Sequence, residues 1–204
     1  MPEILSKVDS KNFEVKALLY KNVLISGDFD SGKTLLLKRL AEEYIREGVP
    51  LILIDTVYEH KSKSLIAYFE LNDAISAKFD GSNIDYATVR EVLTSSKPVV
   101  AINLSSSLEA SNVPGIEESL RKAIRNDHLQ KCGNIAKLVV EQVPPGKMIV
   151  IISDEVDYPE PILKLLLSNK SIILIMVPNE LSYSAADFDV WLTTERPKSK
   201  VKDL

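Results

Sequence analysis

Cysteine and histidine are scarce in this chain of 204 residues, which holds one cysteine, Cys132, and two histidines. A single cysteine cannot form an internal disulfide, so we expect no disulfide partner and a reducing compartment. Long apolar runs are missing too, since none approaches the roughly 18 residues that a membrane-spanning helix needs. The N-terminal stretch MPEILSKVDSKNFEVK carries too many charges for a secretory signal peptide. These absences favour a soluble protein inside the cell.

Positive charge is also in deficit, because 25 lysines and arginines face 29 acidic residues, a formal net charge of −4. The chain is therefore not a general binder of polyanions. Any contact with nucleic acid has to come from a local basic surface, or from a ring of copies that concentrates a few lysines. At 45% hydrophobic and 26% charged residues, the composition is that of a folded globular protein. The length suits one compact domain over residues 1–204.

Short β-branched runs alternate with longer amphipathic stretches along the chain. Several runs are apolar at consecutive positions, which is typical of strands covered on both faces. The predicted strands are Val23–Ser26, Leu51–Asp55, Ile75–Phe79, Val99–Leu104, Met148–Ser153, Ile172–Val177 and Phe188–Leu192, and the predicted helices are Thr34–Glu47, Ile84–Leu93, Gly115–Val140 and Pro161–Leu167. This alternation predicts an α/β fold with a mostly parallel central sheet and helices on both faces.

Residues 27–34 read GDFDSGKT and match the phosphate-loop motif G-x-x-x-x-G-K-[ST] in full, between a predicted strand and a predicted helix. Gly27 and Gly32 let backbone N–H groups converge on a phosphate, and the helix that follows adds its positive end. Lys33 places a charge on the β- and γ-phosphate oxygens, and the Thr34 hydroxyl ligates Mg²⁺. The predicted nucleotide-binding residues are Gly27, Asp28, Phe29, Asp30, Ser31, Gly32, Lys33 and Thr34. We expect the two aspartates to point outward, because such a loop binds through its backbone.

A second motif ends the predicted strand Met148–Ser153, which runs into Asp154 and Glu155. An apolar strand that ends in acids looks like the Walker B strand, which lies near the phosphate loop. Asp154 is then a magnesium ligand together with Thr34, and Glu155 is the general base that activates water for attack on the γ-phosphate. An acid directly after the magnesium acid favours hydrolysis over kinase or GTPase chemistry. Solvated acids at a strand end are the alternative.

Further polar residues have roles that the sequence leaves open. Asn179, after the strand Ile172–Val177, either senses the γ-phosphate or turns a loop. Asp55 either supports the site from behind or caps a turn. His128 and Cys132 stand four residues apart in the long predicted helix, and two groups do not make a zinc site.

The 27–34 motif, the strand ending in Asp154 and Glu155, Asn179 and the closing strand within DFDVWL at 187–192 resemble the HerA–FtsK superfamily of DNA-translocating ATPases. Within it, the short chain is similar to the genome-packaging ATPases of tailless icosahedral double-stranded DNA viruses with an internal membrane. The resemblance covers about residues 22–192 and leaves a basic tail at 196–204. It implies a P-loop fold of the additional-strand, catalytic-Glu type. Family members often carry Gln at the position of Asn179.

The resemblance also implies an activity and partners. It predicts a ring, often hexameric, that hydrolyses ATP with Mg²⁺ and drives duplex DNA into a preformed capsid. The implied partners are the DNA backbone and proteins of the capsid vertex or viral membrane, and the implied locations are the host cytoplasm and the virion. Lys33, Thr34, Asp154 and Glu155 take the nucleotide, magnesium and base roles, and Asn179 the sensor role.

Ring ATPases complete each site with an arginine from the neighbouring subunit. Arg121 or Arg125 is the candidate here, because the two share a face of the long predicted helix. Ion pairing with the glutamates one turn earlier is the alternative. The candidate DNA contacts are Lys61, Lys63, Lys198, Lys200 and Lys202, and solvated loops are the alternative for each cluster.

Other P-loop classes fit less well. A nucleotide or nucleoside kinase lines its acceptor site and lid with several arginines, whereas this chain has six scattered ones. A small GTPase needs an Asn-Lys-x-Asp motif, and the segment NKSI at 169–172 lacks its acid. A transporter ATPase needs an LSGGQ-like signature, which is absent. A nucleotide-controlled assembly protein has no use for a base at Glu155.

Overall fold

The structure is a computed structural model that describes residues 3–28, 30–56, 64–104, 114–179 and 183–195. Within these ranges, eight strands form one sheet in the order β1-β8-β2-β7-β6-β3-β5-β4, and every neighbouring pair runs parallel. The strands are β1 (Glu3–Val8), β2 (Val23–Gly27), β3 (Leu51–Asp55), β4 (Ala77–Asp80), β5 (Val99–Asn103), β6 (Ile149–Asp154), β7 (Ile172–Val177) and β8 (Val190–Thr194). The α/β class with a parallel sheet, predicted from the sequence, is confirmed.

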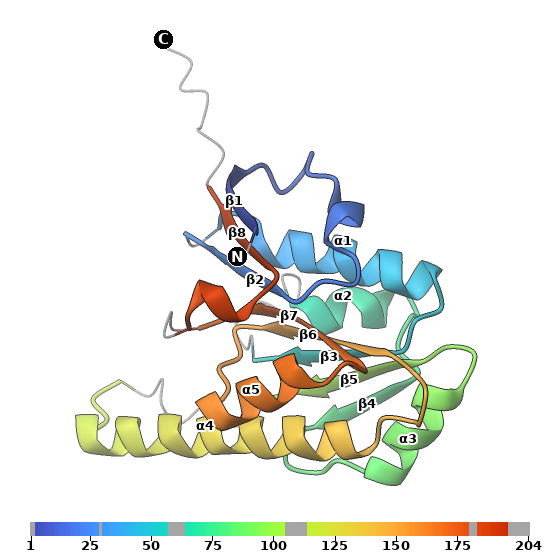
Figure 1. The fold of residues 1–204 in the computed structure, drawn as a ribbon. Helices are drawn as coiled ribbons and strands as arrows, with labels where there is room; N and C mark the ends of the chain where they lie inside the picture. The colour runs from blue at the N-terminus through green and yellow to red at the C-terminus, as the bar shows by residue number, and fades with distance from the viewer. Residues whose placement is uncertain (1–2, 29, 57–63, 105–113, 180–182, 196–204) are drawn as a thin grey trace.

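Helices cover both faces of the sheet (Figure 1). One face carries α1 (Lys33–Arg46) and α2 (Leu65–Leu71), and the other carries α3 (Tyr86–Thr94), α4 (Glu118–Glu141) and α5 (Glu160–Ser168). Short 3-10 turns, η1 (Val15–Leu18) and η4 (Ala185–Asp187), complete the described elements. Among the described residues, no helix combines the length and the apolar composition that crossing a bilayer requires.

The residues of each central strand alternate between the two helix layers. In β3, Leu51 and Leu53 belong to the core cluster of α1 and α2, whereas Ile52 and Ile54 belong to the cluster of α3, α4 and α5. All residues of β3, β6 and β7 are buried. Strands covered on both faces were expected from their consecutive apolar residues, and the burial confirms it.

The structure corrects the sequence prediction at the N-terminus and after β3. The predicted core began near residue 22, yet β1 pairs with β8 and adds an edge strand to the sheet. An edge strand needs only a few apolar residues, and Ile4 in β1 is 62% exposed. The sequence of β1, EILSKV, therefore lacks the continuous apolar run by which the central strands were predicted. The helix α2 has seven residues, which is too short for a clear helical period. Its first turn is capped by the Ser64 side chain, which accepts from the Ala67 N–H.

Helix α1 connects the core to the segment that carries the 27–34 motif. Its buried face consists of Leu36, Leu37, Leu40, Ala41 and Tyr44. The helix ends at Arg46, and Gly48 follows two residues later. There the Gly48 N–H donates to the Ile45 carbonyl and the Val49 N–H donates to the Tyr44 carbonyl, so the last turn is closed by backbone hydrogen bonds.

We predict that Leu40→Ala lowers the free energy of unfolding by about 2–5 kcal/mol, because it leaves a cavity under a fully buried side chain. Leu35→Ala is the matched control on the same helix, since Leu35 is 37% exposed, and we expect it to cost under about 1 kcal/mol. Urea unfolding followed by circular dichroism measures both. Equal losses would contradict the assignment of the α1 core face.

Candidate functional site

The glycine-rich loop, residues 27–34, connects β2 to α1 at the carboxyl edge of the sheet. Its two glycines are required by close packing. A Cβ on Gly27 would lie 2.4 Å from the Thr194 carbonyl oxygen, and a Cβ on Gly32 would lie 2.4 Å from Ser10 Oγ. Gly32 also has a φ of +90°, in the region that favours glycine. The loop is therefore held close to two segments that are distant in sequence.

Side chains from both ends of the chain brace the loop. Ser10 Oγ donates a hydrogen bond of 2.8 Å to the Ser31 carbonyl, and the Ser31 and Thr194 hydroxyls lie 2.5 Å apart. On α1, Arg39 donates to the carbonyls of Ser10 and Phe13, at 2.7 and 2.6 Å. The sequence analysis missed these residues, because nothing in their local pattern shows that they meet the loop.

The charged side chains of the loop lie at its surface and against its own backbone. Lys33 Nζ donates to the carbonyls of Gly27 and Asp28, at 2.9 and 2.8 Å, so its ammonium group lies against the loop itself. Asp28 and Asp30 are both exposed, as expected for a loop that would bind through its backbone. Phe29, the remaining predicted residue of the loop, lies outside the described residues.

A hydrogen bond joins the glycine-rich loop to the acidic end of β6. Thr34 Oγ1 donates to Asp154 Oδ2 at 2.7 Å, across 120 residues of sequence. In the sheet, β7 lies between β2 and β6, so Thr34 reaches Asp154 past the end of that strand. Asp154 is 1% exposed, and its second oxygen, Oδ1, is buried without a hydrogen-bond partner within the described part of the chain.

Asp55 adds a second buried carboxylate beside Asp154. The two residues are Cα partners on β3 and β6, and each is 1% exposed. Burial raises the pKa of Asp154 to about 7; the Asp55 carboxylate adds to this, and the Thr34 hydrogen bond opposes it. The pKa of Glu155 is raised by burial and by Asp55, while Lys33 lowers it. The nearby cation and hydrogen-bond donor therefore neutralise only part of the negative charge of the site.

Asp55 and Lys38 show how the fold organises this charge. Ser64 Oγ and the Ile66 N–H donate to Asp55 Oδ2, at 2.6 and 3.3 Å, so Asp55 both faces the site and holds the start of α2. Lys38 lies one turn beyond Thr34 on α1, with its Nζ 4.9 Å from the centre of the Tyr68 ring. Burial lowers the pKa of Lys38, and the nearby Asp154 and Asp55 oppose that shift. The sequence left Asp55 undecided and missed Lys38.

Glu155, the residue after Asp154, has an uncommon backbone conformation. Its φ is +55°, which costs a non-glycine residue on the order of 1–3 kcal/mol. Three hydrogen bonds fix this turn. Thr56 Oγ1 donates to the Glu155 carbonyl at 2.7 Å, the Thr56 N–H donates to the Asp154 carbonyl at 3.4 Å, and the Val156 N–H donates to the Val177 carbonyl at 3.3 Å. Strain maintained in this way is common at functional sites.

The donor atoms fit a magnesium ion. Among the described residues, no group of three or more histidine, cysteine or acidic side chains forms a metal cluster. Magnesium does not need one, since it binds through one or two carboxylates and takes its other ligands from water and substrate phosphates. Thr34 Oγ1 and the unpartnered Asp154 Oδ1 are oxygens of the required kind at the required place.

The other predicted site residues differ in how they relate to this centre. Asn179 is exposed, two residues beyond β7, whose end lies between the glycine-rich loop and Asp154. Arg121 lies in α4, and its side chain is 34% exposed. Its Nη1 lies 3.8 Å from Glu118 Oε2. Arg125 is exposed one turn further on. The predicted DNA contacts Lys61, Lys63, Lys198, Lys200 and Lys202 lie outside the described residues.

His128 and Cys132 form a buried pair inside α4. Cys132 Sγ and His128 Nε2 lie 3.4 Å apart. Burial lowers the pKa of His128 to about 4 and raises the pKa of Cys132 to about 12, so both groups are neutral near pH 7. The pair is part of the packing between α4 and the sheet.

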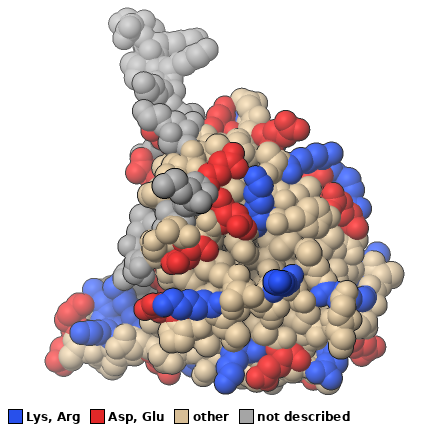
Figure 2. Space-filling model, in the orientation of Figure 1, with Lys and Arg blue, Asp and Glu red and all other residues tan. Residues whose placement is uncertain are grey.

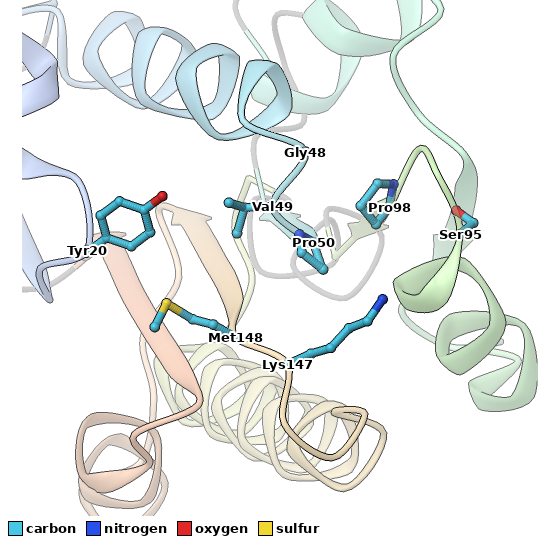
Figure 3. A pocket seen from close by; sticks show the side chains of 8 residues that line it. All are labelled: Tyr20, Gly48, Val49, Pro50, Ser95, Pro98, Lys147 and Met148. Carbon is cyan, nitrogen blue, oxygen red and sulfur yellow. The ribbon is translucent and has the colours of Figure 1, made fainter.

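A pocket of about 260 Å³ lies at the opposite edge of the sheet (Figure 3). Its lining comes from residues that precede β3, β5 and β6, with Tyr20 at one side: Tyr20, Gly48, Val49, Pro50, Ser95, Pro98, Lys147 and Met148. None of these residues belongs to the loop or to the acidic strand ends. The candidate site is therefore at the carboxyl edge, and this pocket is separate from it.

Comparison with known proteins gives no match to any family model, to any curated protein or to any solved structure. What the site does has to be inferred from its own residues and their geometry.

We predict that Asp154→Asn stabilises the metal-free protein. The folded-state pKa of about 7 exceeds the ordinary 3.8, so the folded protein binds this proton more tightly than the unfolded chain does. The free energy of unfolding therefore falls as pH rises from about 4 to about 7. Asparagine keeps an acceptor for Thr34 and removes the charge. We expect a gain on the order of 2–4 kcal/mol near pH 8 and a smaller one near pH 5.

Urea unfolding in a chelating buffer at both pH values measures this gain. Asp28→Asn is the control, because Asp28 is an exposed aspartate of the loop, and it should change stability little at either pH. A loss of stability in Asp154→Asn, or a gain that does not change with pH, would contradict the buried-charge argument.

We further predict that Gly32→Ala destabilises the protein more than Gly48→Ala does. Both glycines have positive φ, so each alanine costs about 1 kcal/mol of backbone strain. Only at position 32 does the new methyl also meet another residue, the Ser10 side chain, which adds about 1–3 kcal/mol. Thermal or urea unfolding compares the two variants. Equal costs would show that Ser10 does not pack against the loop.

Proposed function

We propose that this chain is a P-loop ATPase of the additional-strand, catalytic-Glu type, and that it works as a ring-forming motor on double-stranded DNA. The observation that carries the ATPase part is the hydrogen bond of 2.7 Å between Thr34 and Asp154. It joins the last residue of a full phosphate-loop motif to the first acid of the second motif. Two independent sequence signals thus converge on one place, where a nucleotide phosphate and its magnesium would be held.

The strand order supports the class within P-loop proteins. β7 is inserted between β2, which leads into the glycine-rich loop, and β6, which ends in the acids. In the proposal, β7 is the additional strand of this class, and Asn179, two residues beyond its end, is the γ-phosphate sensor. Glu155, directly after Asp154, corresponds to the catalytic glutamate.

Each group of residues at the site has its own role in the proposed reaction. The N–H groups of the loop and the start of α1 bind the β-phosphate, and Lys33 offsets the charge of the β- and γ-phosphates. Thr34 and Asp154 would hold Mg²⁺, which would supply further charge neutralisation on the phosphates. A water oxygen attacks the γ-phosphorus in line, the bond to the β–γ bridging oxygen breaks, and ADP leaves. Glu155 takes the proton of the attacking water, and its raised pKa suits that task.

The motor part of the proposal rests on the resemblance in motifs and on the shape of α4. From Glu118 to Asp127 no residue of this helix is buried, and this half extends past the sheet (Figure 1). Figure 2 shows basic and acidic side chains side by side at this end of the molecule, and the basic residues of this half of α4 are Arg121, Lys122 and Arg125. We assign Arg121 or Arg125 to the ATP site of a neighbouring copy in the ring.

The remaining parts of the proposal follow from the same resemblance. Duplex DNA is contacted through its backbone, with Lys61, Lys63, Lys198, Lys200 and Lys202 as the proposed contacts. The DNA moved is a viral genome, which is packaged into a capsid with the help of vertex or membrane-associated proteins, in the host cytoplasm or the virion.

We predict that Glu155→Gln lowers steady-state phosphate release from ATP and Mg²⁺ by about 10²–10⁴-fold, because amide oxygen cannot take the proton. ATP binding, measured by fluorescence of a labelled ATP analogue, should stay within a few-fold. Glu141→Gln is the matched control, since Glu141 is exposed at the end of α4. Turnover that survives Glu155→Gln would remove Glu155 from the catalytic role.

The same assay tests the motor. Turnover per chain should rise with protein concentration and with long duplex DNA, because neighbouring copies complete each other's sites. The motor assignment would be wrong if turnover depended on neither protein concentration nor DNA. Turnover that starts only when a nucleoside monophosphate is added as phosphate acceptor would indicate a kinase.

A further inference from the structure

Thr56, the residue after β3, makes two hydrogen bonds to the backbone of the acidic pair. Its hydroxyl donates to the Glu155 carbonyl at 2.7 Å, and its N–H donates to the Asp154 carbonyl at 3.4 Å. Thr56 itself is 6% exposed. Both bonds come from the residue after β3 and reach two successive carbonyls, so they hold the peptide groups on both sides of the Glu155 Cα.

The backbone on both sides of Glu155 has to be held in this conformation, because Glu155 has a φ of +55°. The left-handed conformation is uphill for a residue with a side chain, and it persists only where the surroundings impose it. It also determines where the carboxylate points, since rotation about the backbone swings the whole side chain. On the other side of the turn, the Val156 N–H donates to the Val177 carbonyl of β7 at 3.3 Å. The turn is thus fixed between β3 and β7.

The end of β3 is itself anchored. Asp55, the residue before Thr56, accepts hydrogen bonds from Ser64 Oγ and from the Ile66 N–H at the start of α2. Its Cα is the register partner of Asp154 on β6. Thr56 therefore projects from a fixed point, which a positioning group requires.

We propose that Thr56 is a positioning residue for Glu155: its hydroxyl holds Glu155 in the left-handed conformation and so directs the carboxylate to the attacking water. This inference rests on the proposed ATPase function. Thr56 touches the Glu155 backbone and not the side chain, so its effect on the reaction passes through Glu155. Binding of ATP does not depend on it, because its bonds go to neither the glycine-rich loop nor Thr34.

The test compares Thr56→Val, which keeps the size and removes the donor, with Thr56→Ser, which keeps the donor. In the full-length protein with ATP and Mg²⁺, we expect Thr56→Val to lower kcat about 10–100-fold while KM for ATP changes less than about twofold. Thr56→Ser should stay within about threefold of the wild type in kcat. In a Glu155→Gln background, Thr56→Val should lower kcat no further, because the residue through which it acts is already disabled.

Three results would overturn the proposal. The first is a loss in Thr56→Ser as large as in Thr56→Val, which would show that the hydroxyl alone does not preserve activity; if Thr56→Val does not fold, a loss of more than about threefold in Thr56→Ser overturns the proposal by itself. The second is a change in KM instead of kcat. The third is an equal loss from Thr56→Val with and without Glu155→Gln.

A crystallographic comparison separates this proposal from the proposed function. If the wild type shows no ATP turnover, the ATPase assignment fails, and the crystal structures of wild type and Thr56→Val still test the device. We expect a left-handed Glu155 in the wild type and a shift of its backbone out of that region in Thr56→Val. An unchanged backbone at Glu155 without the hydroxyl would overturn the positioning role independently of any activity.

Discussion

The hydrogen bond between Thr34 and Asp154 is the contact on which the arrangement of the site depends. β2 and β6 are two strand spacings apart, about 10 Å, because β7 lies between them. Thr34 can reach Asp154 only because α1 begins at Lys33 and passes over β7 and β6. The tight turn at Gly32 and the bracing by Ser10 set where α1 begins. Hydrogen bonds therefore link the N-terminal segment, the glycine-rich loop and the acidic end of β6 to one another.

The same place concentrates features that oppose stability. Two carboxylates are buried side by side at Asp55 and Asp154, one oxygen of Asp154 has no hydrogen-bond partner in the described chain, and Glu155 carries backbone strain. Each costs free energy, which an apolar replacement would recover at the two carboxylates and a glycine would recover at Glu155. Lys38, the helix α2 start and Thr56 reduce that cost without removing it. A fold keeps such a cluster when the charge and the strain have a use, and binding a divalent cation with its phosphates is a use that fits both.

The sequence predicted the fold class, the central strands and both halves of the proposed site, because those signals are local. Apolar runs mark β3, β6 and β7, and the 27–34 motif is contiguous. What it missed depends on contacts across the chain. Ser10 and Thr194 brace the loop from either end, and Thr56 looks like an ordinary residue after a strand until its hydroxyl is seen on Glu155. The strand β1 was missed for a different reason: it lies at the sheet edge, where Glu3 and Ile4 are exposed.

The parallel sheet separates the residues that stabilise the core from the residues that form the candidate site. All strands send their carboxyl ends to one edge, so Gly27, Asp55, Asp154 and Asn179 lie at that edge, although the central strands are mostly apolar before it. The amino ends meet at the other edge, where the lining of the pocket is largely apolar. Substitutions inside the strands should therefore change stability with little effect on the chemistry of the site. Substitutions of the buried carboxylates at the carboxyl edge should change that chemistry and raise stability, because the buried charge lies at the last residues of β3 and β6 and the strain at the residue after β6.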